Sequence, residues 1–478
     1  MKQLNSLKVW LSVVLLLCFS LSGQAQFLRT SYFMEGSNQR MQLNPALMPG
    51  RGYLNIPVIG SLNATVNSSS LGYRDIMDII ENSDDSDYFM SNDFMNRLDA
   101  TNNLNVNLST DILSAGWYKG KNFWSVNVGL RNDIGAAIPK TMFQFMNNMS
   151  SREFGDNISD YWGINETING QKLEINSYAE VGLGFARNIT DRLAVGGKVK
   201  MLLGIGNLKL NINQIHVETP SVGSSGVTSK ASIQVDATLE NSSKLLELPE
   251  NENGDYIDEI DFGSFGFAGY GGAIDLGVSY KLLDKLTLSA SVLDLGFIKW
   301  SKSNTSIARA NAEQTYDLLD PASQQEFINI VNSGEILNYD MLQLKTEEAS
   351  EKSRTRGLTS TMVLGAEYAL LNDWLVVGAL YTGRFAKPKT LNELTFSACI
   401  RPTNAFNVAA SYSVLQGAGK TFGLALKLGP FFAGTDYMFF GKNTKNVNAY
   451  LGVSIPLGKQ KTAENRSEER RVGKECRL

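Results

Sequence analysis

The stretch from Asn446 to Leu457, NVNAYLGVSIPL, alternates between two kinds of residue without a break. One set consists of Val447, Ala449, Leu451, Val453, Ile455 and Leu457, and the other of Asn448, Tyr450, Gly452, Ser454 and Pro456. Successive side chains of a β-strand point to opposite faces, so a period of two puts these sets on different faces. The stretch therefore predicts a β-strand with one apolar and one mostly polar face.

The same alternation recurs in the runs that precede this stretch. They are Phe406–Val414, Phe422–Leu428 and Phe431–Phe439. A strand of about 9–11 residues is long enough to cross a bilayer at a tilt, and charge here is confined to the minority face. The series predicts a transmembrane β-barrel with lipid outside and a polar lumen inside. A hydrophobic content of 43 % and a mean hydropathy of -0.14 fit this fold, because only alternate residues meet lipid.

The connections between the runs alternate between short and long. Short turns are expected near Gly120, Asn188, Asp284, Asn372, Thr403 and Gly429, and long excursions at Ser68–Thr101, Ala136–Gln171, Gly204–Phe267 and Ser301–Arg356. Outer-membrane barrels have short periplasmic turns and longer external loops. With Gly204–Phe267 taken as one excursion the strands number about 14, an even count as such barrels require. The predicted fold is all-β, an antiparallel transmembrane barrel; a soluble β-sandwich, which needs no such parity, is the alternative.

Local patterns inside the long excursions predict further structure. Alternation at Asn207–Val217 and at Lys230–Leu239 predicts a hairpin, and Ala322–Asn332 has a helix-like pattern. Between the excursions, the phase of the alternation slips near Leu293, which predicts a β-bulge.

The two ends of the chain are not expected to belong to the barrel. Residues 1–25 join a lysine-containing start to a short apolar run and end in Gly23-Gln24-Ala25, which predicts a cleaved signal peptide and a mature start at Gln26. Residues 460–478 are predicted to be a disordered tail, and the charged sequence from Arg466 onward resembles non-native read-through. The expected organisation is a hatch-like segment at 26–52 and a barrel at 53–459.

The irregular segment before the first strand contains Asn44-Pro45-Ala46-Leu47. In this position the motif resembles the FadL-like superfamily of outer-membrane long-chain fatty-acid transporters, and the chain is most similar to uncharacterised members from Bacteroidota. The resemblance spans residues 26 to about 459. It implies that the segment folds into the barrel as a hatch past which a hydrophobic ligand moves. Alternatively the motif is only a turn, since Asn and Pro initiate turns. The excursion Ser301–Arg356 departs from the transporter pattern, and no ligand-binding residues match individually.

Charged residues on the inward phase of the strands are candidates for the lumen wall. They are Arg131, Glu174, Glu180, Lys198, Lys200, Asp275, Glu367, Glu393, Lys427 and Asp436. The two glutamates and two lysines of the fourth and fifth strands are expected to pair with each other, because those strands are neighbours. One interpretation is a polar lumen held together by ion pairs, and the other is the lining of a selective channel.

Apolar residues inside two excursions are candidates for a hydrophobic ligand loop. They are Met142, Phe143, Phe145 and Met146, together with Ile76, Met77, Ile79 and Ile80 of the earlier excursion. Met and aromatic side chains suit adaptable apolar sites, so one interpretation is an external groove for acyl chains. The other is local packing that closes the loops over the barrel.

Composition argues against several classes of function. His216 is the only histidine and no G-x-S-x-G motif is present, so no enzyme is expected. With both ends set aside, Cys399 is the only cysteine, so neither a disulfide framework nor a Cys/His metal site is expected, and no cofactor is implied. The formal charge of -4, without a basic patch, does not favour nucleic acid.

These patterns predict a barrel of the bacterial outer membrane, surrounded by outer-membrane lipids, that binds or passively takes up small hydrophobic compounds. The alternative is a non-transporting structural or interaction barrel that works with a periplasmic or secretion-system protein. An apolar cavity running inward from the loops would favour the first function. A lumen filled by charged pairs would favour the second.

Overall fold

The computed structural model describes residues 28–57, 61–72, 75, 91–150, 162–220, 229–251, 253–254, 256–257, 261–332, 342–347, 353–385, 390–415, 421–437 and 445–458. The expected signal peptide, the tail from residue 460 and the apolar group from Ile76 to Ile80 lie outside the described residues. Among the helices that are described, none is both long and apolar enough to cross a membrane.

The elements of the first half are η1 (Asn38–Gln42), β1 (Gly52–Asn55), β2 (Leu62–Ser68), α4 (Asn92–Arg97), β3 (Thr101–Lys119), β4 (Asn122–Pro139), α5 (Lys140–Ser150), β5 (Asn165–Asn188), β6 (Leu193–Glu218), β7 (Lys230–Ser243), β8 (Leu246–Glu247) and β9 (Asp261–Phe262). Those of the second half are β10 (Gly269–Lys281), β11 (Leu286–Trp300), η3 (Lys302–Asn304), β12 (Thr305–Asp317), α6 (Pro321–Asn332), β13 (Lys345–Thr346), β14 (Arg354–Gly357), β15 (Thr361–Leu370), η4 (Leu371–Asp373), β16 (Leu375–Arg384), β17 (Leu391–Thr403), β18 (Phe406–Leu415), β19 (Thr421–Leu428), β20 (Phe431–Thr435) and β21 (Asn446–Leu457).

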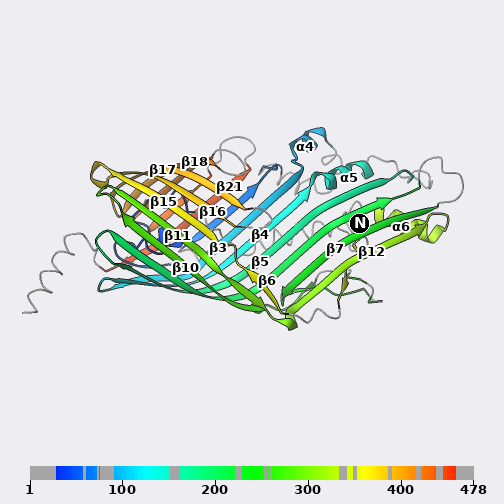
Figure 1. Ribbon diagram of the computed structural model, residues 1–478, viewed down its shortest axis with the longest axis horizontal. Coiled ribbons are helices and arrows are strands. Elements are labelled where there is room, and N and C mark those ends of the chain that lie inside the picture. Colours follow the sequence, from blue (N-terminus) through cyan, green and yellow to red (C-terminus); the bar gives the residue numbers. More distant parts are fainter. Residues whose placement is uncertain are drawn as a thin grey trace, which may run out of the picture.

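A closed antiparallel barrel of 14 strand positions accounts for most of these strands (Figure 1). β1 and β2 share the first position, because both pair with β3 on one side and with β21 on the other. From β3 the order runs through β4, β5, β6, β10, β11 and then β15 to β21, each strand pairing with the next. The predicted fold class and strand number are therefore confirmed.

The two ends of the barrel differ in the length of their connections. Short connections join β3 to β4, β5 to β6, β10 to β11, β15 to β16, β17 to β18 and β19 to β20, all at one end. We call this end the turn end and the opposite one the loop end. The six turns lie where the sequence placed them, at Gly120, Asn188, Asp284, Asn372, Thr403 and Gly429.

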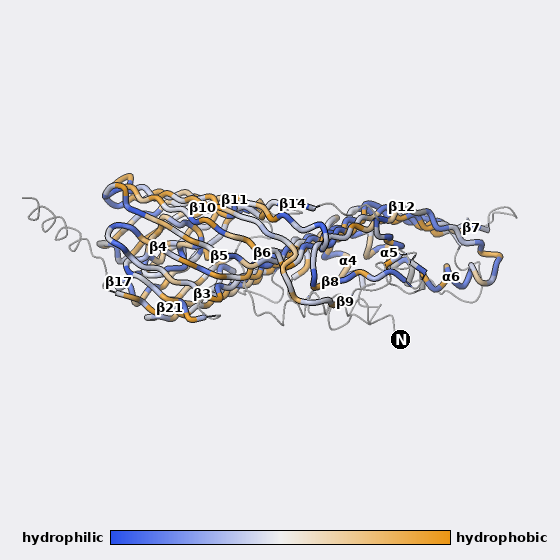
Figure 2. The backbone as a smooth tube through the Cα atoms, turned by 90° about the horizontal axis from the view of Figure 1, so that it is seen from below, coloured by the Kyte–Doolittle hydropathy of each residue, from blue (hydrophilic) through white to orange (hydrophobic). Residues whose placement is uncertain are grey.

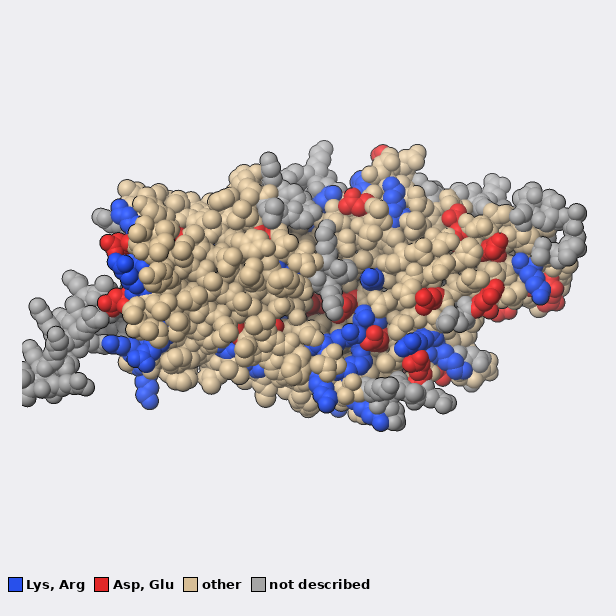
Figure 3. All heavy atoms as spheres, in the orientation of Figure 1, with Lys and Arg blue, Asp and Glu red and all other residues tan. Residues whose placement is uncertain are grey.

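The outer wall of the barrel is apolar and the inner wall is mostly polar. The large apolar side chains exposed on the outer wall include Leu183, Val199, Met201, Ile274, Leu276, Phe396, Phe422 and Leu451. Residues between them on the same strands, such as Glu180, Lys200 and Asp275, are buried inside. In the view of Figure 3, charged side chains gather at the turn-end rim and beyond the loop end, with a largely uncharged zone between them. Alternation has thus produced the two faces that a membrane-spanning strand needs.

Beyond the loop end, a sheet projects from one side of the barrel (Figures 1 and 2). β6 pairs with β10 from Leu193 to Gly204 and with β7 from Gly206 to Glu218, and β7 pairs in turn with β12. We call β7, β12, α5, α6 and the projecting parts of β5 and β6 the extension. The hairpin and the helix expected in these excursions are present as β6–β7 and as α6.

The extension has its own hydrophobic core. Ile168 of β5, Ile215 of β6 and Phe327 of α6 are each no more than 1 % exposed and belong to one apolar cluster, which also includes Phe145 of α5. The apolar residues of β6 and β7 alternate with polar ones, so the sheet buries one face beneath the helices and leaves the other to solvent.

A β-bulge interrupts the pairing of β10 with β11, as the slip near Leu293 predicted. At this point Asp294 adopts a positive φ of 57° and its side chain turns to the lumen, where its carboxylate lies 2.6 Å from the Lys200 ammonium. A bulge adds one residue to one strand and so re-aims the side chains that follow. The irregularity therefore supplies a lumen carboxylate that the regular alternation would not.

Lysine at Val199 tests the lipid-facing wall. Val199 is 65 % exposed and pairs with the outward-facing Leu183 and Ile274, so we expect Val199→Lys to cost about 2–4 kcal/mol near the bilayer midplane. Folding into lipid vesicles, followed by heat-modifiable gel mobility, should decline. Leu319→Lys is the control, because Leu319 is 77 % exposed but lies in the connection between β12 and α6 of the extension, away from the barrel wall. Equal folding of both variants would contradict the assignment of this wall.

Candidate functional site in the lumen and at its mouth

The N-terminal segment, residues 28–50, enters the lumen and is fixed there by a buried arginine. The Arg29 guanidinium lies 2.5 Å from a Glu393 carboxylate oxygen and also contacts the Tyr437 hydroxyl. The backbone N–H groups of Arg29 and Thr30 donate to the two carboxylate oxygens of Asp436, at 3.2 and 2.8 Å. A buried ion pair is stable only when its remaining hydrogen-bonding capacity is satisfied, and these contacts satisfy most of it.

Aromatic residues that follow Arg29 fill the turn-end half of the lumen. Tyr32, Phe33 and Met34 are at most 1 % exposed and pack among lumen-facing residues of β15, β16 and β17, including Cys399. A side chain at Gly378 would overlap the Phe33 ring, so the wall and the segment approach closely only because this residue is glycine. The lumen is therefore not polar throughout, which the sequence did not predict.

The motif Asn44-Pro45-Ala46-Leu47 lies against the inner wall formed by β6, β10 and β11. The Asn44 amide donates to the backbone carbonyls of Val278 and Ala290, at 3.2 and 3.3 Å, and its oxygen accepts from the N–H of Ala46. Close contacts with Pro45 and Asn44 also require the glycines at 196 and 277. The motif is thus both a turn and an attachment to the wall, while its role as a hatch stays a prediction.

A chain of ion pairs crosses six strands of the inner wall. Arg131 on β4 lies 2.7 Å from both Asp111 on β3 and Glu180 on β5. Lys200 on β6 lies 3.8 Å from Glu180 and 2.8 Å from Asp275 on β10, and it also reaches the Asp294 carboxylate on β11. We call this the charge chain.

The structure separates the other predicted lumen charges into distinct places. Lys198 joins the charge chain through Glu180 at 3.5 Å. Glu393 and Asp436 hold the N-terminal segment, as described above. Glu367 pairs with Arg40 and Arg401 at 3.4 and 3.0 Å. The Lys427 ammonium donates to the carbonyls of Asn404 and Gly429 at the turn end.

Glu174 does not pair with Lys198 or Lys200, contrary to the expectation for the fourth and fifth strands. Across the sheet it faces Lys209 instead, while Glu180 faces Leu202 and reaches the two lysines diagonally. Six residues along a strand separate the two glutamates, which is about 20 Å, so only one of them can meet that pair of lysines.

Several residues of the site escaped sequence reasoning. Arg29 and Arg40 lie in an irregular segment where no periodicity indicates direction, and Asp111 precedes a register shift of β3. The phase slip near Leu293 was a usable signal for Asp294, because a bulge there re-aims the next residues.

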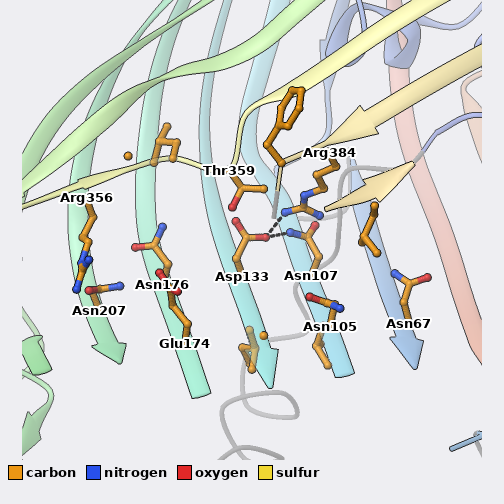
Figure 4. A pocket seen from close by; sticks show the side chains of 17 residues that line it. Asn67, Asn105, Asn107, Asp133, Glu174, Asn176, Asn207, Arg356, Thr359 and Arg384 are labelled. Carbon is orange, nitrogen blue, oxygen red and sulfur yellow. Dashed lines mark hydrogen bonds and ion pairs between the residues drawn. The ribbon is translucent and has the colours of Figure 1, made fainter. Parts of the chain in front are cut away.

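Where the lumen meets the extension lies a cavity of about 70 Å³ with both polar and apolar lining residues, which we call the mouth pocket (Figure 4). Its wall includes Asn67, Asn105, Asn107, Asp133, Glu174, Asn176, Asn207, Arg356 and Arg384. The Arg384 guanidinium and the Asn107 amide both contact the Asp133 carboxylate. Arg356 reaches away to Glu240 of the extension, at 2.5 Å.

The predicted hydrophobic ligand loop is part of α5. Phe143 is buried against Phe94 of α4, with ring centroids 5.5 Å apart, and Phe145 belongs to the core of the extension. Met142 packs at the edge of that core, and the side chain of Met146 lies outside the described residues. In this conformation the rings contact protein, and their ligand role stays a prediction.

Glu240 connects the extension to the loop end of the barrel. Its carboxylate lies 2.7 Å from Arg354, 2.5 Å from Arg356 and 3.5 Å from Lys209. Burial favours the neutral form of Glu240, but the three cations outweigh this effect and hold its pKa below the ordinary value.

Together these features define a membrane-spanning antiparallel β-barrel whose lumen contains its own N-terminal segment and whose strands carry an external sheet. The chain belongs to the family of unknown function DUF5723, whose model matches residues 45–436. No curated protein shows a significant sequence match to the chain.

Solved structures similar to this chain include two toluene transporters and a FadL homologue. The toluene transporter TbuX of Ralstonia pickettii has 9 % identity and a TM-score of 0.40, with 92 % of this chain and 100 % of that chain covered. The P. putida toluene transporter TodX has 11 % identity, a TM-score of 0.41 and coverages of 92 % and 100 %. A Pseudomonas aeruginosa FadL homologue has 9 % identity and a TM-score of 0.38, with 91 % of this chain and 98 % of that chain covered. Likeness at this level carries no argument about ligands.

Replacing Glu240 by glutamine should loosen the extension at neutral pH. Because the folded-state pKa of Glu240 is depressed, its ionised form stabilises the fold above the ordinary Glu pKa of about 4.3, and this contribution is lost as pH falls further. Thermal scanning of tryptophan fluorescence should show Glu240→Gln melting lower than the native chain at pH 7, with the gap closing in acid.

Glu326→Gln on the solvent-exposed side of α6 is the matched control for this prediction. A gap between Glu240→Gln and the native chain that persists unchanged in acid would contradict the electrostatic explanation.

Proposed function

We propose that the protein is an outer-membrane β-barrel that is closed at rest and acts through its external half, as a binding or interaction barrel. The apolar outer wall supports a membrane location, and the rule of short periplasmic turns puts the loop end and the extension outside the cell. The buried attachment of the N-terminal segment carries the proposal.

The N-terminal segment occupies the path that a solute would take. Its aromatic residues pack inside the turn-end half, and Arg29 is 2 % exposed between Glu393 and Asp436. Removing one partner of a buried pair costs about 3–5 kcal/mol, because a charge is left without compensation. A compound crossing the lumen would have to displace this attachment, so the arrangement supports a closed barrel over an open pore.

The extension supports a role outside the membrane. It adds β7 and β12 to the barrel strands and has a separate hydrophobic core, whereas a simple pore needs only loops at this end. In this proposal the barrel anchors the extension and positions it for binding. A secretion-system partner at the cell surface is compatible with this role, whereas the periplasmic partner that the sequence offered as an alternative would meet only the turn end.

A second candidate function is passive uptake of small hydrophobic compounds. The observation that favours it is the apolar cluster of Phe94, Met95, Leu98 and Phe143 between α4 and α5 at the loop end. A hydrophobic compound could enter there only by replacing existing contacts between these side chains.

Planar-bilayer recording tests the closed state. The native chain should show no steady conductance, and deletion of residues 26–50 should produce it. Arg29→Ala should open frequently, because Glu393 and Asp436 lose their cation. If the deletion variant does not fold, the conductance of Arg29→Ala alone tests the proposal. Arg309→Ala is the control, since Arg309 is an exposed extension residue that pairs with Glu347. Steady conductance of the native chain would overturn the proposal.

Displacement of a fluorescent fatty acid tests the second candidate. If the cluster around Phe143 admits acyl chains, Phe143→Ala should change the affinity several-fold, because the contacts that a ligand must replace are altered. Phe265→Ala, which removes a 70 % exposed aromatic side chain, is the control. Absence of saturable binding, or equal affinity in both variants, would count against uptake at this cluster.

A further inference from the structure

The mouth pocket is lined by an unusual number of carboxamides. Asn67 on β2, Asn105 and Asn107 on β3, Asn176 on β5 and Asn207 on β6 all contribute to its wall. Figure 4 shows these residues on the same side of their strands, around Asp133 and Arg384. Four of five successive strand positions thus present amides to one space at the loop end, and β4 between them contributes Asp133.

The ionic groups of the pocket balance each other. The wall contains the carboxylates of Asp133 and Glu174 and the guanidinium groups of Arg356 and Arg384. Arg384 contacts Asp133 directly, and Arg356 is engaged by Glu240 outside the pocket. Asp133, Arg356 and Arg384 are therefore already paired, and among the described residues Glu174 alone of these four groups has no ion-pair partner, so the wall does not favour an anion.

Amide groups have the hydrogen-bonding character that a polyhydroxylated ligand requires. Each carboxamide offers donors and an acceptor, and each sugar hydroxyl is likewise donor and acceptor. Within the described residues, the Asn176 side-chain oxygen is buried and has no hydrogen-bond partner, which is costly unless a ligand or water satisfies it.

An aromatic ring stands at the same pocket. Phe385 follows β16, is 54 % exposed and lines the cavity beside Arg384. An exposed aromatic face next to a polar wall suits a ligand that is apolar on the faces of its ring and polar at the edges. The cavity of about 70 Å³ has room for a few water molecules, so it can take the hydroxyl-bearing edge of a sugar ring while the rest of the ring lies outside it against Phe385.

We propose that the mouth pocket binds a neutral saccharide from outside the cell, with Asn67, Asn105 and Asn176 hydrogen-bonding its hydroxyls and Phe385 packing on its ring. Asn107 and Asn207 are already engaged, by Asp133 and by Arg354 and the Ile175 carbonyl, and complete the polar wall. The inference rests on the proposed function, because it takes the loop end to face the exterior. Along β6 the same face continues from Asn207 to Lys209 and Asn211 of the extension, so a saccharide chain can extend from the pocket over a polar surface.

The test is calorimetric titration of the full chain in a detergent that contains no sugar. The probes are neutral hexasaccharides, namely maltohexaose, cellohexaose, mannohexaose and chitohexaose, with hexagalacturonate as the anionic comparison. We expect saturable binding of at least one neutral probe. Asn105→Ala and Asn176→Ala should each weaken it about three- to tenfold, as expected for one lost hydrogen bond, and Phe385→Ala should also weaken it.

Asn329→Ala is the matched control, because it makes the same change on the exposed side of α6. The inference is overturned if no neutral probe binds, if hexagalacturonate binds more tightly, or if the pocket variants bind as the native chain does. Conductance separates the two proposals. A closed barrel without saccharide binding refutes only this inference, whereas an open native barrel refutes the proposed function whatever the titration gives.

Discussion

A sheet that lies in lipid cannot leave its edges unpaired, and this constraint organises the whole molecule. Hydrocarbon offers no partner to backbone N–H and C=O groups, so the membrane part of the chain must close on itself. Closure is achieved where β1 and β2 pair with β21. Outside the membrane water can satisfy an edge, and there β7 and β12 extend the sheet without closing it.

Closure also determines what the inside of the barrel must do. Every strand sends half of its side chains into the lumen, and a lumen of this size has to be filled by protein or water. At the turn end the N-terminal segment fills it with aromatic residues, and nearer the loop end Arg29 of the same segment pairs with Glu393. Farther toward the loop end, the charge chain and the asparagines line it. Along the barrel axis the lumen thus changes from an apolar core to a mouth rich in amides, and the two parts are suited to different functions.

The sequence predicted the regular part of this structure well because period-two alternation is a local signal. The six turns, the strand count and the bulge near Leu293 all follow from neighbouring residues. The contacts of Arg29 with Glu393 and Asp436 join residues that are several hundred positions apart and begin in a segment without periodicity. The pairing of Glu174 was wrong because adjacency of strands does not give their register.

The asparagines of the mouth pocket also could not be brought together from the sequence. Asn105 and Asn107 have the inward phase in the sequence. Nothing local indicates that Asn67, Asn176 and Asn207 lie at the same level along the barrel axis. The level of a residue along the barrel axis depends on the stagger between neighbouring strands, and the alternation within a single strand carries no information about this stagger.

The length of β6 has a consequence for how far this protein reaches. Thirteen of its residues, Gly206 to Glu218, lie beyond the barrel, and at about 3.3 Å per residue they form a continuous strand about 40 Å long. The same strand carries Lys200 in the lumen and Ile215 near the tip. A force on the tip is therefore transmitted to the barrel wall through one continuous hydrogen-bonded strand. The tip can also contact another molecule at a distance from the lipid headgroups.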